Sequence, residues 1–425
     1  MFRLFFPFLL FSSTFCIAQN DLNYYINTAK KNSPIIADNQ NQSLANQKEI
    51  DRLKAFYTKP QIGITANYLL APILNKDSNS SQIQLNPTNA EKYYGYDLGA
   101  TNGGQYQALL NVSQPLFNGQ RYKTNSELMA VNSKINQNNI KLSEHDIEKI
   151  VTDQYILCLQ DSKQIDFVNQ MITLLDNQRT ILRKLVERSI YKQSDATLLN
   201  IEYQNYQGQL AALKANYQSH LFDLNILCGI NDNTLVKLSE NKIPLTAENQ
   251  KSIFFEKFSL DSINLATQQK VFELKYKPQL NAFANTGLNA VNINTISNRF
   301  GISAGISFSY ALFDGNQKKA TRDKTELLQR AITAYKTNFN NQNAMRKAKI
   351  LAELNTYPER ITIVEQQLKE YDLLLISYKN EILVGQLSII NFITTLKNKM
   401  TLQKDFALLS SQQQLLINTY NYWNW

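Results

Sequence analysis

A short phrase occurs twice in this chain, each time between a segment of alternating apolar and polar residues and a long helical segment. Residues 114–121 read QPLFNGQR and residues 310–317 read YALFDGNQ. Asn-Gly and Asp-Gly are turn dipeptides, because glycine accepts a positive φ and Asn or Asp can hydrogen-bond the local backbone. The phrase therefore predicts two strand-to-helix junctions, and a junction that occurs twice indicates a duplicated unit. The junction residues are Phe117, Gly119, Phe313 and Gly315.

Four segments alternate with a period of two, which predicts amphipathic strands. Their expected bounds are about 59–70, 105–117, 278–288 and 299–313, two strands in each half of the chain. The last segment is the most regular, because one face is apolar and the other carries only glycine and serine. Its apolar positions are Phe300, Ile302, Ala304, Ile306, Phe308 and Tyr310.

A long helical hairpin is expected after each junction. In the first hairpin, apolar residues follow a heptad spacing that only Arg179 interrupts, and heptads sustained over such a length indicate coiled-coil packing. At 1.5 Å per residue, the outgoing helix over residues 120–188 would be about 100 Å long, too long for one globular core to enclose. The hairpins are expected to turn near Lys192 and Gly385. Pro358 is expected to kink the corresponding helix of the second half, because proline removes a backbone hydrogen bond.

The first residues predict export. Residues 1–18 contain Arg3, an apolar core and small residues at the −3 and −1 positions, which is the pattern of a secretory signal peptide. A lipoprotein signal with Cys16 acylated is the alternative, but it requires a small residue where this chain has Phe15. The mature chain, 19–425, has no run of about 18 apolar residues, so we expect no transmembrane helix. A periplasmic protein, a secreted protein or an outer-membrane barrel remains.

The composition excludes several classes of function. The formal net charge of +9 is a mild excess spread along the chain without a basic block, which favours a solvated helical surface over nucleic-acid binding. His145 and His220 begin no cluster with metal-ligand spacing, and His220 is expected at a helix interface. No catalytic set or phosphate loop can be assembled, so we expect neither an enzyme nor a cofactor. Isolated Asp and Glu residues in the heptads are interpreted as solvated.

Two cysteines follow the signal segment, Cys158 and Cys228, which is too few for a disulfide framework. They lie at similar sequence distances from the expected turn near Lys192, so they could be neighbours. Packed helix axes are about 8–10 Å apart, whereas a disulfide needs Cα atoms within about 7 Å of each other. Two thiols are therefore favoured over a disulfide.

Four amphipathic strands cannot close a barrel alone, since about eight strands are the minimum for a small barrel. An open sheet edge in lipid would leave backbone groups with no hydrogen-bond partner. We therefore expect the strands of several subunits to be pooled. Twelve strands from a trimer are the simplest closed arrangement.

In this order, the features resemble the TolC-like outer-membrane efflux protein family over essentially the whole mature chain. An N-terminal helix pair enters a strand at Lys59-Pro60, and a Leu-Phe-Asx-Gly junction stands in both halves. The first hairpin closes with LCGIN at residues 227–231, similar to the family's Gly-Asn ending. Residues 384–391, VGQLSIIN, are similar to the family's Gly-x-x-(Ser/Thr)-x-x-Asp turn.

The resemblance implies a mixed α and β fold. It implies a homotrimer with a 12-stranded transmembrane β-barrel, four strands per chain, continuous with a long periplasmic α-helical coiled-coil tunnel. Two internal structural repeats are implied at about 19–231 and 248–425. The location implied is the cell outer membrane, with a large periplasmic portion.

The function implied is that of the exit channel of a tripartite efflux or type I secretion system, exporting small molecules or proteins. The implied partners are a periplasmic membrane-fusion adaptor, an inner-membrane transporter and outer-membrane lipid, without nucleic acid. The alternative is a secreted or periplasmic coiled-coil scaffold or adhesin without a pore. The two-faced strands favour the channel, because a scaffold gains nothing from an apolar face opposite a Gly/Ser face.

The hairpin tips depart from the family. In its best-known members, carboxylates at the tip form an acidic constriction. Counting from Gly385 and Tyr191 in this chain places neutral residues at the corresponding positions. These are Asn391, Thr394, Thr197 and Asn200. The alternative is that Asp195, Glu202 or another acidic side chain turns inward and rebuilds an acidic ring one helical turn away.

Overall fold

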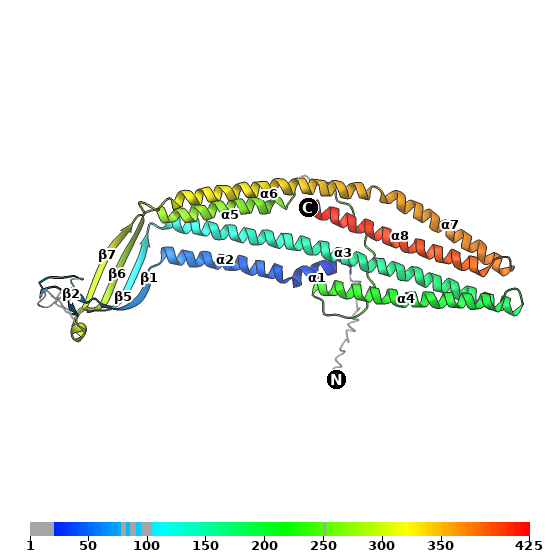
Figure 1. Ribbon diagram of the computed structural model, residues 1–425, viewed down its shortest axis with the longest axis horizontal. Helices are drawn as coiled ribbons and strands as arrows, with labels where there is room; N and C mark the ends of the chain where they lie inside the picture. Colours follow the sequence, from blue (N-terminus) through cyan, green and yellow to red (C-terminus); the bar gives the residue numbers. More distant parts are fainter. Residues whose placement is uncertain (1–20, 78–81, 86–90, 95–103, 250–251) are drawn as a thin grey trace, which may run out of the picture. The chain divides into compact units, whose positions relative to one another are not determined.

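The computed structural model describes residues 21–77, 82–85, 91–94, 104–249 and 252–425. The expected signal segment, 1–18, lies outside the described residues. The fold is mixed α and β, and Figure 1 shows its elements. The helices are α1 Leu22–Asn32, α2 Pro34–Thr58, α3 Gly119–Glu187, α4 Gln193–Cys228, α5 Phe255–Glu273, α6 Gln317–Leu354, α7 Tyr357–Leu383 and α8 Ile389–Trp423, with short 3-10 helices η1 Leu274–Tyr276 and η2 Ile293–Asn298. The strands are β1 Gln61–Leu70, β2 Ile73–Asn75, β3 Gln82–Gln84, β4 Tyr93–Tyr94, β5 Gly104–Leu116, β6 Gln279–Ala290 and β7 Phe300–Ser309.

The chain divides into two compact units. The sheet unit comprises residues 39–138 and 255–336. The hairpin unit comprises the remainder, with segments ending at Asp38, Phe254 and Trp425. No helix among the described residues contains a stretch long and apolar enough to cross a membrane.

The sheet unit contains a four-stranded antiparallel sheet in the order β1-β5-β6-β7, whose strands lie side by side in Figure 1. The register pairs Gln61 with Ser113, Leu116 with Leu280, and Gln279 with Ser309. The four strand termini that connect to helices therefore lie at the same end of the sheet. In the sequence between β1 and β5 are the short strands β2, β3 and β4, which form a separate small sheet in the order β3-β2-β4.

The hairpin unit contains two helical hairpins, α3–α4 and α7–α8. Their buried apolar residues form one core, to which each helix contributes a large side chain. Examples are Leu175 in α3, Leu199 in α4, Leu375 in α7 and Phe392 in α8. The Tyr191 hydroxyl donates to the Leu387 carbonyl at 2.7 Å, which joins the turns of the two hairpins.

Pro358 lies at a helix break rather than at a kink within one helix. Helix α6 ends at Leu354, and α7 begins at Tyr357. Pro358 is therefore in the first turn of α7, where the missing backbone N–H has no helical acceptor to lose and the fixed φ suits the helix.

An irregular segment, residues 229–249, follows α4 and is called the strap. It begins at Gly229, whose left-handed φ of 63° ends the helix, and the Asn32 amide donates to the Cys228 carbonyl at 2.9 Å. Tyrosine hydroxyls of α3 and α4 hold the strap, since Tyr155 donates to Ser239 and Tyr217 to Val236, both at 2.7 Å.

Side-chain amides of α8 hold the later part of the strap. Gln414 accepts the Ile243 N–H at 2.7 Å, and Asn421 accepts the Thr246 N–H at 2.9 Å. Asn424, just after α8, accepts the Asn249 N–H at 2.9 Å. Backbone groups without a regular ladder are thereby paired.

Cys158 and Cys228 are both buried and free, in an apolar cluster formed by α1, α3, α4 and the strap. Burial raises the pKa of each thiol to about 12. Both groups are therefore neutral thiols at physiological pH, as small buried apolar side chains usually are.

A charged contact in the sheet unit makes its stability depend on pH. Arg322 of α6 binds both carboxylate oxygens of Glu273 of α5, at 2.6 and 2.9 Å. This hydrogen-bonded contact lowers the pKa of Glu273 to about 2. Because the folded-state pKa is depressed, the stabilisation is present above the ordinary pKa of 4.5 and is lost as the pH falls toward about 2.

We predict that Glu273→Gln lowers the unfolding free energy by about 1 kcal/mol at pH 7, the upper range for a partly exposed pair. The difference from the unmodified chain should vanish as the pH falls from about 4.5 to about 2. Thermal unfolding of the full chain measures both effects. Glu326→Gln is the matched control, because its pair with Arg330 is more exposed and lies within one helix. An equal loss in the two variants, or a difference that persists at low pH, would contradict the assignment.

Candidate functional site

The four-stranded sheet has one continuous apolar face. Residues paired across antiparallel strands point to the same face, and Ile64 pairs with Leu110, which pairs with Thr286, which pairs with Ile302. Ile64 is 80 % exposed and Ile302 is 79 % exposed, so no described part of the chain covers the face at these positions. Two polar residues, Gln114 and Thr286, also lie on it. Its apolar members are Ile62, Ile64, Ala66, Tyr68, Leu70, Tyr106, Ala108, Leu110, Val112, Leu116, Leu280, Ala282, Ala284, Leu288, Ala290, Phe300, Ile302, Ala304, Ile306 and Phe308.

The opposite face is uncharged and mainly polar, with Leu69, Leu109, Pro115 and Phe283 as its apolar residues. None of the residues in β1, β5, β6 and β7 is Asp, Glu, Lys, Arg or His. Amides and hydroxyls bond across the strands, as when Asn111 donates to Thr65 at 2.8 Å and Gln105 donates to Asn289 at 3.2 Å. These side chains satisfy one another while remaining open to solvent.

Phe283 is the one large aromatic on the polar face of the described strands. It pairs with Gly305, and a Cβ built on Gly305 would lie 2.7 Å from the Phe283 ring. The ring therefore occupies the space above the glycine, an arrangement that pins register where a strand lacks a side chain. The alternation of the sequence placed Phe283 on this face but carried no signal for its contact.

Both outer strands of the sheet have an edge without a partner in the described part of the chain. β1 pairs only with β5, and β7 pairs only with β6. Each strand thus presents a row of backbone N–H and C=O groups that another strand could bind.

The two strand-to-helix junctions differ in backbone conformation. In the first, the positive φ falls on Phe117 (53°), and Gly119 begins α3. In the second, Gly315 (64°) and Asn316 (66°) are both left-handed, and α6 begins only at Gln317. The expectation that the glycine takes the positive φ is therefore wrong for Gly119. Since α3 starts two residues earlier in its copy of the phrase, Gly119 is helical and the left-handed residue comes before it, at Phe117.

The structure places the four tip residues on the first turns of two helices. Thr197 and Asn200 lie in α4, and Asn391 and Thr394 lie in α8. Thr197, Asn391 and Thr394 are exposed and Asn200 is half-buried. Their neighbours Leu199 and Phe392 point into the hairpin core. Within each pair, the two side chains are three residues apart and share a helix face.

The two nearby carboxylates are both engaged. Asp195 accepts the Lys192 backbone N–H at 3.1 Å and caps the start of α4. Glu202 is only 4 % exposed and lies 3.0 Å from Lys397 of α8. The interpretation of heptad charges as solvated is therefore wrong for Glu202.

A second charged contact also enters the hairpin core. Lys399 of α8, 7 % exposed, lies 2.5 Å from Asp372 of α7. Arg179, the residue that interrupts the heptads, lies over the ring of Tyr203 at 4.3 Å. The interruption of the heptads was a signal for Arg179 without naming its partner, and the heptad spacing carried no such signal for Glu202 or Lys399.

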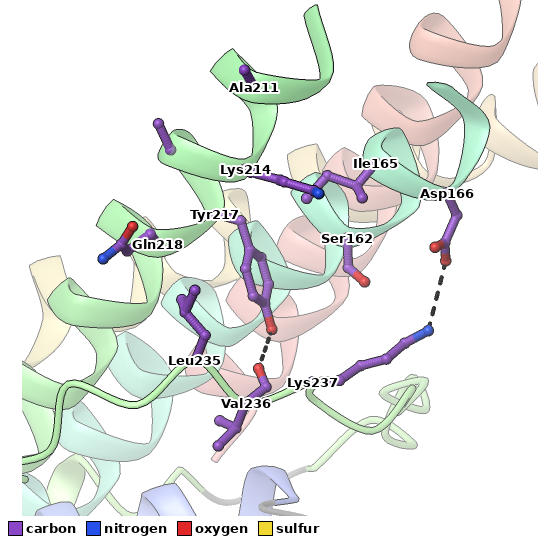
Figure 2. A pocket seen from close by; sticks show the side chains of 11 residues that line it. Ser162, Ile165, Asp166, Ala211, Lys214, Tyr217, Gln218, Leu235, Val236 and Lys237 are labelled. Atoms are coloured by element: carbon purple, nitrogen blue, oxygen red, sulfur yellow. Dashed lines mark hydrogen bonds and ion pairs between the residues drawn. The ribbon is translucent and has the colours of Figure 1, made fainter. Parts of the chain in front are cut away.

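An open groove of about 600 Å³ lies between α3, α4 and the strap (Figure 2). Figure 2 shows the Tyr217 hydroxyl directed at the Val236 carbonyl and Lys237 directed at Asp166, 3.9 Å away. The described residues that line the groove include neither histidine nor cysteine. The lining is thus a mixture of short apolar and long polar side chains without a nucleophile–base pair.

The two histidines have structural contacts. His220 hydrogen-bonds Asp161 at 2.6 Å on the α3–α4 interface, where it was expected. His145 lies against the rings of Tyr422 and Trp425 at 4.7 and 4.1 Å. Burial lowers the pKa of His145, so it is neutral at pH 7. Among the described residues, no group of three or more His, Cys, Asp and Glu could hold a metal ion.

No protein-family model matches the chain, and no curated protein matches it in sequence. Solved structures do match. The outer-membrane channel OprN aligns with a TM-score of 0.69 and 12 % identity, over 95 % of this chain and 89 % of that chain. CusC aligns with a TM-score of 0.69 and 11 % identity, over 96 % and 92 %. VceC from Vibrio cholerae aligns with a TM-score of 0.65 and 13 % identity, over 95 % and 96 %. These are outer-membrane channels of the TolC family, so the resemblance is confirmed for the fold.

We predict that Gly305→Val destabilises the sheet by about 1–3 kcal/mol, because the new side chain overlaps the Phe283 ring. The double variant Gly305→Val, Phe283→Ala should recover most of the loss. Gly301→Val is the control in the same strand, since a Cβ there meets nothing within 4 Å. Thermal unfolding of the full chain in detergent measures all three. If Gly301→Val and Gly305→Val are equally destabilising, β-propensity rather than the aromatic contact explains Gly305.

Proposed function

We infer that the chain is the outer-membrane exit channel of an export system, and that three copies form the channel together. The observation that carries this proposal is the sheet, which is uncharged throughout, mainly apolar on one face and mainly polar on the other. Among the described strands, neither of its outer edges has a partner. An apolar face without charge suits lipid, and a hydrated amide and hydroxyl face suits the lumen of a pore.

The strand directions support closure by identical copies. Neighbouring strands in β1-β5-β6-β7 are all antiparallel, so β7 runs opposite to β1. An edge contact between β7 of one copy and β1 of the next therefore continues the antiparallel pattern. Repeating that contact around an axis removes both edges, as lipid requires.

The number of strands supports a trimer. Two copies would supply eight strands, whose interior side chains would fill. Three copies supply twelve, which leaves an open lumen and satisfies cyclic symmetry. The proposal therefore includes a homotrimer with a 12-stranded barrel, while the hairpins form a periplasmic tunnel by coiled-coil packing.

The likeness to solved channels supports the rest of the proposal. The similar structures include OprN, described as an outer-membrane channel, and CusC, described in terms of transmembrane channel formation. By analogy, the chain is exported by its signal segment 1–18, has two repeats at about 19–231 and 248–425, and works with a membrane-fusion adaptor and an inner-membrane transporter. Its cargo is small molecules, as in efflux, or proteins, as in type I secretion.

The hairpin tips form the constriction in this proposal. Thr197, Asn200, Asn391 and Thr394 line it, and no carboxylate contributes. The capping role of Asp195 and the ion pair of Glu202 support a neutral ring, because both carboxylates are held by other groups.

We predict that Ile306→Arg blocks assembly, whereas Ser307→Arg leaves a folded trimer with altered conductance. The two residues are adjacent on opposite faces of β7, and a cation at the lipid midplane costs about 2–4 kcal/mol but far less in the lumen. Native mass measurement after extraction from the outer membrane, followed by planar-bilayer recording, separates the outcomes. Equal assembly of both variants would mean that the faces are assigned wrongly, and a soluble monomer would favour the scaffold.

We also predict that the closed channel lacks strong block by trivalent cations. A carboxylate ring concentrates negative potential and binds multivalent cations, and neutral amides and hydroxyls do not. Planar-bilayer recording with the cation added on the periplasmic side tests this. Asn391→Asp, which adds one carboxylate per copy, should create or strengthen block, whereas Lys404→Gln, a charge change elsewhere on α8, should not. Strong block of the unmodified channel would contradict the neutral ring.

A further inference from the structure

The excess positive charge of the chain is concentrated next to the strand ends. We consider the ten residues on the helix side of each strand end, at 51–60, 117–126, 269–278 and 310–319. Together these four segments contain ten Lys and Arg residues against three Asp and Glu. They therefore hold +7 of the chain's formal net charge of +9. The excess looked spread out along the sequence because four distant segments share it.

The fold brings these segments together. The antiparallel register places Gln61, Leu116, Gln279 and Ser309 at one end of the sheet. The residues beyond them therefore gather at that end, which we call the helix-side end. All of them belong to the sheet unit. We call six of the basic residues at the helix-side end the basic collar: Lys59, Arg121, Lys123, Lys275, Lys277 and Lys319.

Of the three acidic residues at this end of the sheet, two are held by basic residues outside the collar, and only Asp314 offsets a collar charge, that of Lys275. Glu273 binds Arg322, and Asp51 lies 3.7 Å from Lys48. Asp314 accepts the Lys318 backbone N–H at 2.8 Å at the start of α6. Five members of the collar, Lys59, Lys123, Lys275, Lys277 and Lys319, are exposed.

Large apolar side chains stand beside the collar with almost no cover. Phe117 is 91 % exposed, Leu312 is 89 % exposed and Phe313 is 84 % exposed. Phe117 follows β5 directly, and Leu312 and Phe313 come three and four residues after β7 ends at Ser309. All three therefore lie at the helix-side end of the sheet, next to the basic residues. Aromatic and apolar anchors next to Lys and Arg are the combination favoured at a membrane–water interface.

The segments that connect the strands at their other ends have no such excess. The connecting segments 71–103 and 291–299 contain three basic and three acidic residues in the sequence. The excess of basic residues is therefore confined to the helix-side end of the sheet, and a general need for solubility does not explain it.

We propose that the basic collar binds the headgroups of anionic phospholipids in the periplasmic leaflet of the outer membrane. The inference rests on the proposed insertion of the sheet in that membrane. With the apolar face in lipid, the collar stands at the depth of the headgroups, where Lys and Arg attract anionic lipid phosphates. Phe117, Leu312 and Phe313 lie against the acyl chains beneath.

The test uses the purified full-length assembly in detergent and native mass spectrometry. The assembly is incubated with equal amounts of phosphatidylglycerol and phosphatidylcholine that have identical acyl chains, and bound lipids are counted. We expect a preference for phosphatidylglycerol of about tenfold or more, because each basic residue near an anionic surface contributes roughly fivefold. The preference should disappear at about 1 M salt, because the Debye length is then only about 3 Å and attraction between exposed charges farther apart is screened.

Two quadruple variants locate the site. The collar variant should reduce the preference to about twofold or less, and the control variant, which neutralises four exposed lysines of the hairpin unit, should retain it. The collar variant is Lys59→Gln, Lys123→Gln, Lys277→Gln and Lys319→Gln. The control variant is Lys184→Gln, Lys349→Gln, Lys369→Gln and Lys404→Gln.

Each outcome decides the proposal. Equal binding of the two lipids by the unmodified assembly, or an equal loss of preference in both variants, overturns it. Displacement of the lipid by millimolar inorganic phosphate would show an anion site that does not require a lipid, and would also overturn it. A conducting trimer without lipid preference refutes the collar alone. A lipid-selective chain that forms no pore refutes the channel alone.

Discussion

The antiparallel register of β1, β5, β6 and β7 is the constraint on which the rest of the structure depends. Because paired residues share a face, one register puts Ile64, Leu110 and Ile302 together and leaves the amides on the other side. A shift of any strand by one residue would mix the two faces completely. The same register aligns the four helix-side strand ends, which gathers charges from four parts of the sequence.

The strands and hairpins could be predicted from sequence because each depends on a local period. The alternation around Ile306 appears as β7, and the heptad residues Leu175, Leu182 and Leu375 lie in the hairpin core. The two copies of the junction phrase were less informative. The left-handed residue is Phe117 in the first copy but Gly315 and Asn316 in the second, because the start of the following helix decides which residue must be left-handed.

Contacts between distant residues could not be predicted, because periodicity assigns a face and not a partner. Glu202 occupies a heptad position that looks solvated, yet it is buried beside Lys397, about two hundred residues later. Lys399 similarly enters the core because Asp372 accompanies it. Breaking such a pair leaves a charge with poor solvation, so these sites are less tolerant of substitution than their residue types suggest. The tip assignments made from sequence alone remain predictions for the same reason, since a ring requires neighbours that the chain by itself does not contain.

The contacts of the strap with α8 limit how far the strap itself can change in length. Gln414 and Asn421 are seven residues apart on α8, which is about 10.5 Å along a helix, and they bind Ile243 and Thr246, three residues apart, which extended chain spans in about 10 Å. Two periods thus coincide between a helix and a segment without secondary structure. Inserting one residue between Ile243 and Thr246 would destroy that match, although irregular surface segments usually accept insertions. The link between the halves should therefore conserve its length more strictly than its residue types.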